Sequence, residues 1–138
     1  MAKIVLCRMR DEKQMKLLIL GGTRFVGRHL VEEALAQGHE VTLFNRGRNN
    51  PELFPEVEKL RGDRDGNLTA LEGRKWDAVI DTCGYVPRLV RDSAQLLADA
   101  VAHYTFISTI SVYQTKDKLE IDEMCEVGGL EDETVEEI

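Results

Sequence analysis

Apolar and polar positions alternate along the chain in blocks that have the lengths of strands and helices. Residues 17–20 read Leu-Leu-Ile-Leu, a short continuous apolar run that is typical of a strand covered on both faces. Apolar positions then recur at helical spacing from Val26 to Leu35, and Gly38 stands where such a helix should end. Residues 40–44 have the character of a second strand. The pattern therefore predicts a strand, a helix and a second strand in direct succession.

The alternation of strands and helices continues along most of the remaining chain. The later elements expected are a short strand around Leu60, one or two helical turns over 66–72, a strand over 76–81, a helix over 88–102 and a strand over 104–108. Such alternation favours a parallel sheet with right-handed crossovers and helices on both faces. We expect a doubly wound α/β fold of about five strands in the order 3-2-1-4-5, with ligands beyond the carboxyl ends of the strands.

Length and composition are those of one globular domain with a charged end. The 138 residues are 43% hydrophobic, no apolar run is long enough to span a membrane, and the first residues resemble no signal peptide. We expect a cytoplasmic protein with no membrane partner. Residues 117–138 hold ten of the 25 acidic side chains and one basic side chain, which indicates a flexible acidic tail or loop. The expected divisions are an extension (1–14), the α/β domain (15–116) and this tail (117–138).

The cysteine and histidine residues indicate no metal site. Cys7, Cys83 and Cys125 lie far apart in the sequence, and the three histidines are equally scattered. Neither set has the spacing of metal ligands. We expect reduced thiols and no bound metal.

The junction after the first strand has the pattern of a nucleotide-binding turn. Gly21 and Gly27 are its outer glycines: the first permits a tight turn, and the second lets the helix pack closely on the strand. Backbone N–H groups of the turn then face a pyrophosphate, and the helix dipole favours that anion. Turns that bind no ligand use the same residues, so the glycines alone do not distinguish a nucleotide-binding turn from a purely structural one. The strand-helix-strand context favours nucleotide binding.

Four short motifs follow one another along the chain. They read Leu20-Gly-Gly-Thr-Arg-Phe-Val-Gly27, Gly62-Asp63, Asp77-Ala-Val-Ile-Asp81 and Phe106-Ile-Ser-Thr-Ile-Ser-Val-Tyr113. In this order they resemble the motifs of the extended short-chain dehydrogenase/reductases, the NAD-dependent epimerase/dehydratase family. The resemblance covers about residues 15–113 and implies a Rossmann fold. Arg24 departs from the family pattern, because it stands in the place of the middle glycine. This variant resembles an atypical branch that includes reductases and chloroplast stem-loop RNA-binding proteins.

The resemblance implies a role for each residue of these motifs. The pyrophosphate turn would comprise Gly21, Thr23, Phe25, Val26 and Gly27, and Gly22 and Arg24 in the same turn are further candidate cofactor-binding residues. Asp63 and Arg64 would lie beside the adenine, and Cys83 and Gly84 would line the channel toward the nicotinamide ribose. Thr109 matches the Ser/Thr that hydrogen-bonds the substrate oxygen and is the candidate catalytic residue.

The family's Tyr-x-x-x-Lys pair is not found. In that pair the lysine lowers the pKa of the tyrosine so that it can exchange a proton with the substrate. None of the three tyrosines here is followed by a lysine four residues later. We interpret the chain as the cofactor-binding, N-terminal part of an enzyme that acts by hydride transfer on a polar small-molecule substrate such as a nucleotide sugar. We expect it to lack the C-terminal substrate region, to be inactive alone, and to self-associate if a sheet edge is exposed.

The end of the second strand bears on the choice of cofactor. Sites that select NAD commonly have an acidic residue there, whereas this chain has Asn45, followed by Arg46 and Arg48. We expect NADP to be preferred and NAD to be accepted, with Arg24 and Arg46 on either side of the 2′-phosphate. The alternative is that these are ordinary surface arginines.

Two other function classes remain open. An RNA-binding protein on the same fold would use a basic face, but a nucleic-acid partner is not expected because residues 1–116 are only slightly basic and the tail is acidic. A cofactor-free sensor or interaction module would use the glycines only to turn the chain. Stabilisation by a saturating dinucleotide distinguishes the last alternative, because a ligand that binds the folded state must stabilise it.

Overall fold

The computed structural model describes residues 13–114, 121–129, 132, 134 and 136. Nearly all of the expected N-terminal extension, with Cys7, therefore lies outside the described residues, as does about half of the expected acidic tail. Within the described ranges, no helix combines the length and the apolar character needed to cross a membrane.

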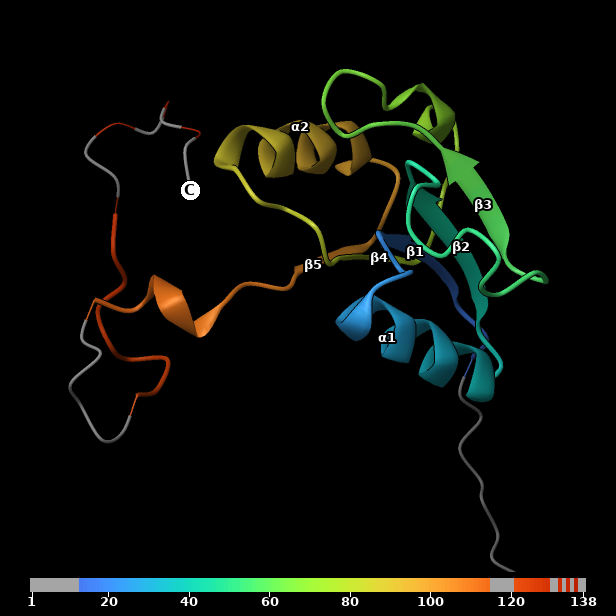
Figure 1. Ribbon diagram of the computed structural model, residues 1–138, viewed down its shortest axis with the longest axis horizontal. Coiled ribbons are helices and arrows are strands. Elements are labelled where there is room, and N and C mark those ends of the chain that lie inside the picture. Colours follow the sequence, from blue (N-terminus) through green and yellow to red (C-terminus); the bar gives the residue numbers. More distant parts are fainter. Residues whose placement is uncertain (1–12, 115–120, 130–131, 133, 135, 137–138) are drawn as a thin grey trace, which may run out of the picture.

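The core of the molecule is one parallel sheet of five strands. These are β1 (Lys16–Leu20), β2 (Glu40–Asn45), β3 (Glu58–Arg61), β4 (Ala78–Asp81) and β5 (His103–Phe106). They lie in the order β3-β2-β1-β4-β5, and every neighbouring pair is parallel. Figure 1 shows helix α1 (Phe25–Ala36) and helix α2 (Pro87–Leu97) on opposite faces of this sheet. The predicted doubly wound fold and its strand order are confirmed.

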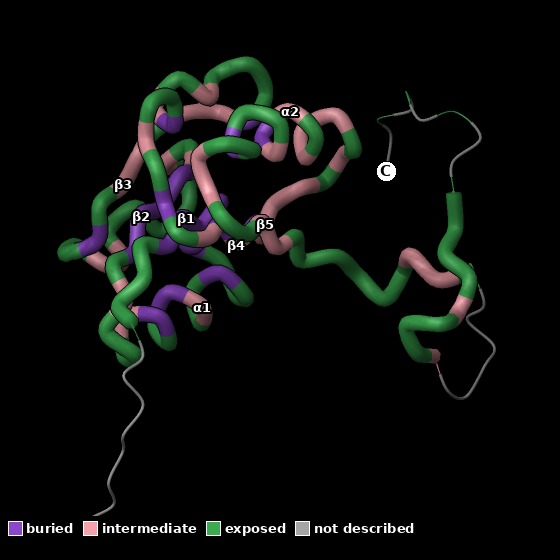
Figure 2. The backbone as a smooth tube through the Cα atoms, turned by 180° about the vertical axis from the view of Figure 1, so that it is seen from behind, coloured by how far each residue is buried: buried purple, intermediate pink, exposed green. Residues whose placement is uncertain are grey.

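Strand β1 supplies both faces of the core, because its side chains point alternately to either side of the sheet. Leu17 and Ile19 pack with Val31 of α1, whereas Leu18 and Leu20 pack with Leu97 of α2. The buried positions accordingly follow the central strands in Figure 2. This two-sided burial explains why the strand is apolar at every core position and does not alternate with polar residues.

The register of the strands brings the candidate site residues to one edge of the sheet. Leu20 at the end of β1 pairs with Phe44 of β2 and with Asp81 of β4. The residues that follow these positions therefore leave the sheet at the same level. This edge carries the carboxyl ends of the strands, where α/β sheets bind their ligands.

Several elements differ in extent from the prediction. Helix α2 ends at Leu97 instead of continuing to residue 102, and strand β4 begins at Ala78 instead of residue 76. Strand β5 ends at Phe106 instead of Ser108, because its partner β4 ends at Asp81 and no longer pairs beyond that position. Residues 66–72 form a 3₁₀ turn, η1 (Thr69–Leu71), whose buried Leu71 packs into the core on the α2 side. A second 3₁₀ turn, η2 (Ile110–Val112), follows β5, in a segment that leads away from the sheet in Figure 1.

Candidate cofactor-binding site

The turn between β1 and α1 has a backbone that only glycine fits at two key points. Gly21 has a φ of +103°, and a Cβ there would lie 2.5 Å from the hydroxyl oxygen of Thr82. A Cβ on Gly27 would lie 2.8 Å from the backbone of Gly22, closer than any real Cβ contact. The glycines therefore let α1 begin directly against the turn, as the sequence predicts.

Asparagine side chains hold the carbonyl groups of this turn. The side-chain amide of Asn45 donates to the carbonyl oxygen of Gly21 at 2.9 Å, and that of Asn50 donates to the carbonyl oxygen of Thr23 at 2.9 Å. Asn50 adopts a φ of 42°, a left-handed conformation that asparagine tolerates better than most residues. The turn is thus fixed from the β2 side by hydrogen bonds to two of its oxygens and by the N–H of Gly21, which donates to the carbonyl oxygen of Phe44 at 2.9 Å.

The N–H groups of the turn are available to a ligand. The first backbone bond of α1 runs from the N–H of Arg28 to the carbonyl of Arg24, and no side chain caps this helix end. Within the described part of the chain, the N–H groups of Gly22 to Gly27 donate to no acceptor. No acidic residue occupies the first turn of the helix. The positive end of the helix dipole is therefore left uncompensated, as an anion-binding site requires.

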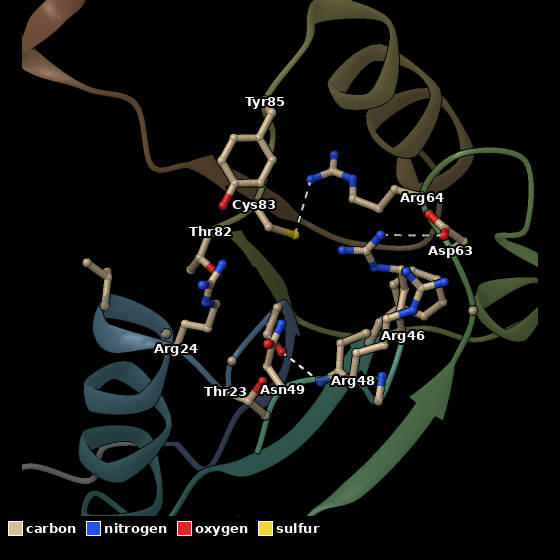
Figure 3. Close-up of a pocket in the computed structure, with 18 of the residues that line it drawn as sticks. Thr23, Arg24, Arg46, Arg48, Asn49, Asp63, Arg64, Thr82, Cys83 and Tyr85 are labelled. Carbon is tan, nitrogen blue, oxygen red and sulfur yellow. Dashed lines mark hydrogen bonds and ion pairs between the residues drawn. The ribbon is translucent and has the colours of Figure 1, made fainter. Parts of the chain in front are cut away.

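A cavity of about 410 Å³ opens over this turn, within the size range of small-molecule sites. Its walls come from the turn and from the ends of β2, β3 and β4, and Figure 3 shows the polar side chains around it. The predicted site residues that line it are Gly21, Gly22, Thr23, Arg24, Phe25, Val26, Gly27, Asn45, Arg46, Asp63, Arg64 and Cys83. Further lining residues, which the sequence argument did not assign to the site, are Phe44, Gly47, Arg48, Asn49, Gly62, Thr82, Tyr85 and Leu89.

The wall at the end of β2 is rich in arginine. Arg46 forms a long ion pair of 3.9 Å with Asp63, and both side chains are about half exposed. Arg48 also lines the cavity, and Arg61 donates to the side chain of Asn45. The side chain of Asn45 at the end of β2 is thus hydrogen-bonded both to the glycine turn and to Arg61 of β3. The end of β2 presents an amide and guanidinium groups to the cavity, with no carboxylate of its own.

Arg64 is buried, although the resemblance places it beside the adenine. Only 8% of its side chain is exposed, and its guanidinium pairs with the fully buried Asp81 at 2.6 Å. The other carboxylate oxygen of Asp81 accepts a hydrogen bond of 2.7 Å from the phenol of Tyr104. Burial lowers the pKa of Arg64, but the pair with Asp81 more than offsets this and leaves the pKa raised. Sequence reasoning missed this network because its members lie on separate elements.

Cys83 lines the cavity beside the same arginine. Its sulfur lies 3.6 Å from a guanidinium nitrogen of Arg64, and Figure 3 shows the two side chains facing each other. Burial raises the pKa of the Cys83 thiol, and Arg64 opposes this shift only in part. Cys83 is therefore a protonated thiol at neutral pH, and thiolate chemistry is not favoured. The described residues contain no group of three or more metal-ligating side chains.

Two predicted site residues do not line the cavity. Gly84 lies behind the wall, where a Cβ would come within 2.4 Å of Val90 and 2.7 Å of Phe106. Its lack of a side chain therefore serves packing between β4, α2 and β5. Thr109 is exposed at the start of η2, where its hydroxyl oxygen accepts a hydrogen bond of 3.2 Å from the N–H of Ser111. Thr109 thus lies beyond the cavity, on the segment that leaves the sheet.

Two plant proteins illustrate the sequence likeness of this chain. It is 30% identical over 122 residues to the chloroplast stem-loop binding protein of 41 kDa b of Arabidopsis thaliana, which covers 77% of this chain and 32% of that protein. It is 44% identical over 45 residues to the bifunctional pinoresinol-lariciresinol reductase of Forsythia intermedia, which covers 33% of this chain and 13% of that enzyme.

Solved structures share the fold. A UDP-galactose 4-epimerase matches with a TM-score of 0.70 at 20% identity, over 83% of this chain and 45% of its own. The enzyme WbmG of Bordetella bronchiseptica in complex with NAD matches with a TM-score of 0.72 at 18% identity, over 88% of this chain and 46% of its own. Less than half of each of these proteins is therefore matched. The model of the NAD dependent epimerase/dehydratase family matches residues 17–134. The chain belongs to this family, the extended short-chain dehydrogenase/reductases, and forms its Rossmann fold.

Proposed function

We propose that this chain binds a nicotinamide dinucleotide, with the diphosphate on the backbone amides of Gly22 to Gly27. The observation that carries this proposal is the row of N–H groups at the uncapped start of α1, which have no acceptor among the described residues and lie at a cavity of suitable size. Two negative charges placed there satisfy these donors and complement the helix dipole. A Cβ on Gly27 would fill the space against Gly22, so the residues present fit the group.

The remaining lining residues suggest how the rest of the dinucleotide is held. Asp63, at the end of β3, is an acceptor beside the proposed adenine position, and Cys83 and Thr82 line the opposite wall. The nicotinamide ring supplies hydride transfer when the cofactor is bound. The chain's own contribution to such chemistry is to bind and orient the dinucleotide. Gly84 acts in this proposal only through the backbone of the wall.

The same cavity favours NADP over NAD in our proposal. Arg46 and Arg48 lie at the end of β2, and Arg24 opens the helix on the other side of the cavity. A 2′-phosphate can accept charge-assisted hydrogen bonds from guanidinium groups, and the amide of Asn45 does not repel it as a carboxylate would. Each such bond contributes about 1.5–3 kcal/mol, so a preference of about tenfold or more is expected.

Isothermal titration calorimetry of the 138-residue chain with NADP and with NAD tests both the dinucleotide site and the preference for NADP. Saturable binding of both, with NADP tighter by about tenfold or more, is the expected result. Equal or tighter binding of NAD removes the preference but leaves the dinucleotide site. Absence of binding by either cofactor, together with an unchanged melting temperature, refutes the site itself.

The activity of a complete protein with this domain is proposed to be hydride transfer on a polar substrate such as a nucleotide sugar. Several structural neighbours are UDP-sugar epimerases, and two of the neighbours are in complex with NAD and UDP. Thr109 would donate its hydroxyl hydrogen to the substrate, since its oxygen already accepts from Ser111. The chain has no tyrosine followed four residues later by a lysine, so we expect it to bind cofactor without turnover. Measurable epimerisation or reduction by the purified chain would contradict this.

RNA binding is the second candidate, favoured by the likeness to a chloroplast stem-loop binding protein. A cluster of arginines at the cavity would then contact phosphates of the RNA backbone. Electrophoretic mobility shifts with a stem-loop RNA at two salt concentrations test it. Binding that weakens steeply with salt and is unaffected by NADP would reverse the ranking.

A further inference from the structure

Arg64 connects the two walls of the cavity. Its backbone follows Asp63 in the wall formed by the end of β3, on the proposed adenine side. Its guanidinium reaches across to the end of β4, where it holds Asp81 at 2.6 Å and lies 3.6 Å from the sulfur of Cys83. The second wall lies on the proposed nicotinamide side. The side chain of Arg64 therefore connects the residues that are proposed to hold the adenine half of the dinucleotide with those that are proposed to hold its nicotinamide half.

The far end of the guanidinium is fixed to helix α2. Its second terminal nitrogen donates to the hydroxyl of Ser93 at 2.7 Å and to the carbonyl of Leu89 at 3.0 Å. Leu89 itself lines the cavity. Ser93 is fully buried and also contacts the phenol of Tyr104 at 3.1 Å, which links the network to β5. The planar fork of arginine thus sets β4, α2 and the end of β3 at fixed mutual positions.

Stability alone does not account for this arrangement. A buried ion pair often contributes no more than well-packed apolar side chains of the same volume, because both charges lose their hydration. The Nε of Arg64 is also buried without an acceptor among the described residues, which is unfavourable. The network does give Asp81 a complete set of partners, since its Oδ1 also accepts from the N–H of Cys83 at 3.1 Å. That last bond fixes the backbone of the second wall directly.

We infer that Arg64 is a positioning residue. It aligns the second wall, formed by Cys83 and Tyr85 after β4, with the wall formed by Asp63 after β3. The affinity for the whole dinucleotide therefore depends on Arg64 more than the affinity for its ADP half does. This inference rests on the proposed function. ADP occupies the glycine turn and the Asp63 wall, whereas the nicotinamide half also needs the second wall at the correct distance. A misplaced second wall therefore reduces the gain in affinity from ADP to dinucleotide.

The test is the substitution Arg64→Lys in the 138-residue chain, with Arg91→Lys as the matched control. Lysine keeps a positive charge opposite Asp81 but has one ammonium group, which cannot replace the two terminal nitrogens of the fork. Arg91 is exposed on α2 and does not line the cavity. Dissociation constants for ADP and for NAD, whose adenine half is ADP, are measured by calorimetry under the same conditions.

We expect Arg64→Lys to weaken NAD binding by about tenfold or more and ADP binding by less than about threefold, with both unchanged in the control. A purely structural role for Arg64 would lower the melting temperature and weaken both ligands in parallel or neither of them. An unchanged ratio of the two dissociation constants in Arg64→Lys therefore overturns the inference. If wild-type chain binds neither ligand, the proposed function fails and the inference fails with it.

Ser93→Ala keeps the test valid if Arg64→Lys does not fold. The substitution is nearly isosteric and leaves the Arg64–Asp81 pair in place, but it removes one acceptor of the fork. The ratio of the dissociation constants for the dinucleotide and for ADP should change in the same direction as in Arg64→Lys, by about threefold. A ratio equal to that of wild-type chain overturns the inference by this route also.

Discussion

A single added methyl group at Gly27 should close the proposed diphosphate site. In Gly27→Ala the new Cβ would lie 2.8 Å from both the Cα and the N of Gly22, and both are backbone atoms that no rotamer change can move. Either α1 or the turn must shift. Overpacking of this kind destabilises by about 1–3 kcal/mol, and alanine returns about 1 kcal/mol through its helix propensity. We expect a net loss of about 0–2 kcal/mol in the free energy of unfolding.

The effect of Gly27→Ala on affinity should exceed its effect on stability. A shift of the turn breaks at least one charge-assisted hydrogen bond to the diphosphate, worth about 1.5–3 kcal/mol, which corresponds to a loss of about tenfold or more. Urea denaturation measures the stability, and calorimetry with NADP measures the affinity. Gly129→Ala is the control, because a Cβ there would meet nothing within 4 Å. Wild-type affinity in Gly27→Ala would refute the close approach of helix and turn as the basis of the site.

Three further substitutions test other parts of the account. Arg48→Ala should weaken the binding of NADP by about tenfold and the binding of NAD by less than twofold. Calorimetry measures both affinities, with Arg91→Ala as the control, and equal losses for the two cofactors would exclude a contact between Arg48 and the 2′-phosphate. Asn50→Ala should lower the free energy of unfolding by about 1 kcal/mol, because it removes the bond to the carbonyl of Thr23, and wild-type stability in urea would contradict this. Burial raises the pKa of Tyr104 to about 12, whereas the pKa of tyrosine in the unfolded chain is about 10. The protonated phenol therefore stabilises the fold below pH 10, and this contribution is lost as the pH rises toward 12. Urea denaturation of wild-type chain should therefore show about 3 kcal/mol more loss over that interval than Tyr104→Phe shows, and parallel pH profiles would contradict the shift.

The sheet could be predicted from the sequence because its signals are local. The apolar run at 17–20 and the glycines that follow it define a strand, a turn and a helix start within eleven residues. The order of the strands then follows from the crossover rules for alternating strands and helices. The end of β5 was predicted two residues too far along, because it depends on where β4 stops and not on the residues of β5 themselves.

The site could be predicted only where one motif supplies the chemistry. The glycine turn and Asn45 were found from neighbouring residues in the sequence, and the structure places them around one cavity. The burial of Arg64 depends on Asp81, Ser93 and Tyr104, which reach it from β4, α2 and β5. An arginine after Gly62-Asp63 gives no local sign of these partners, because arginine is mostly exposed in folded proteins. The carboxylate of Asp81, directly after the apolar Val79 and Ile80 at the end of a strand, is the one local signal that could have suggested a cationic partner.

The most direct test of the central claim is a titration of the isotope-labelled chain with NADP, followed through the backbone amide resonances. The account predicts that the N–H signals of Gly22 to Gly27 shift saturably and further than those of β3 or β5, because these groups donate to the diphosphate. Saturable binding with shifts elsewhere and none in this turn would contradict the account.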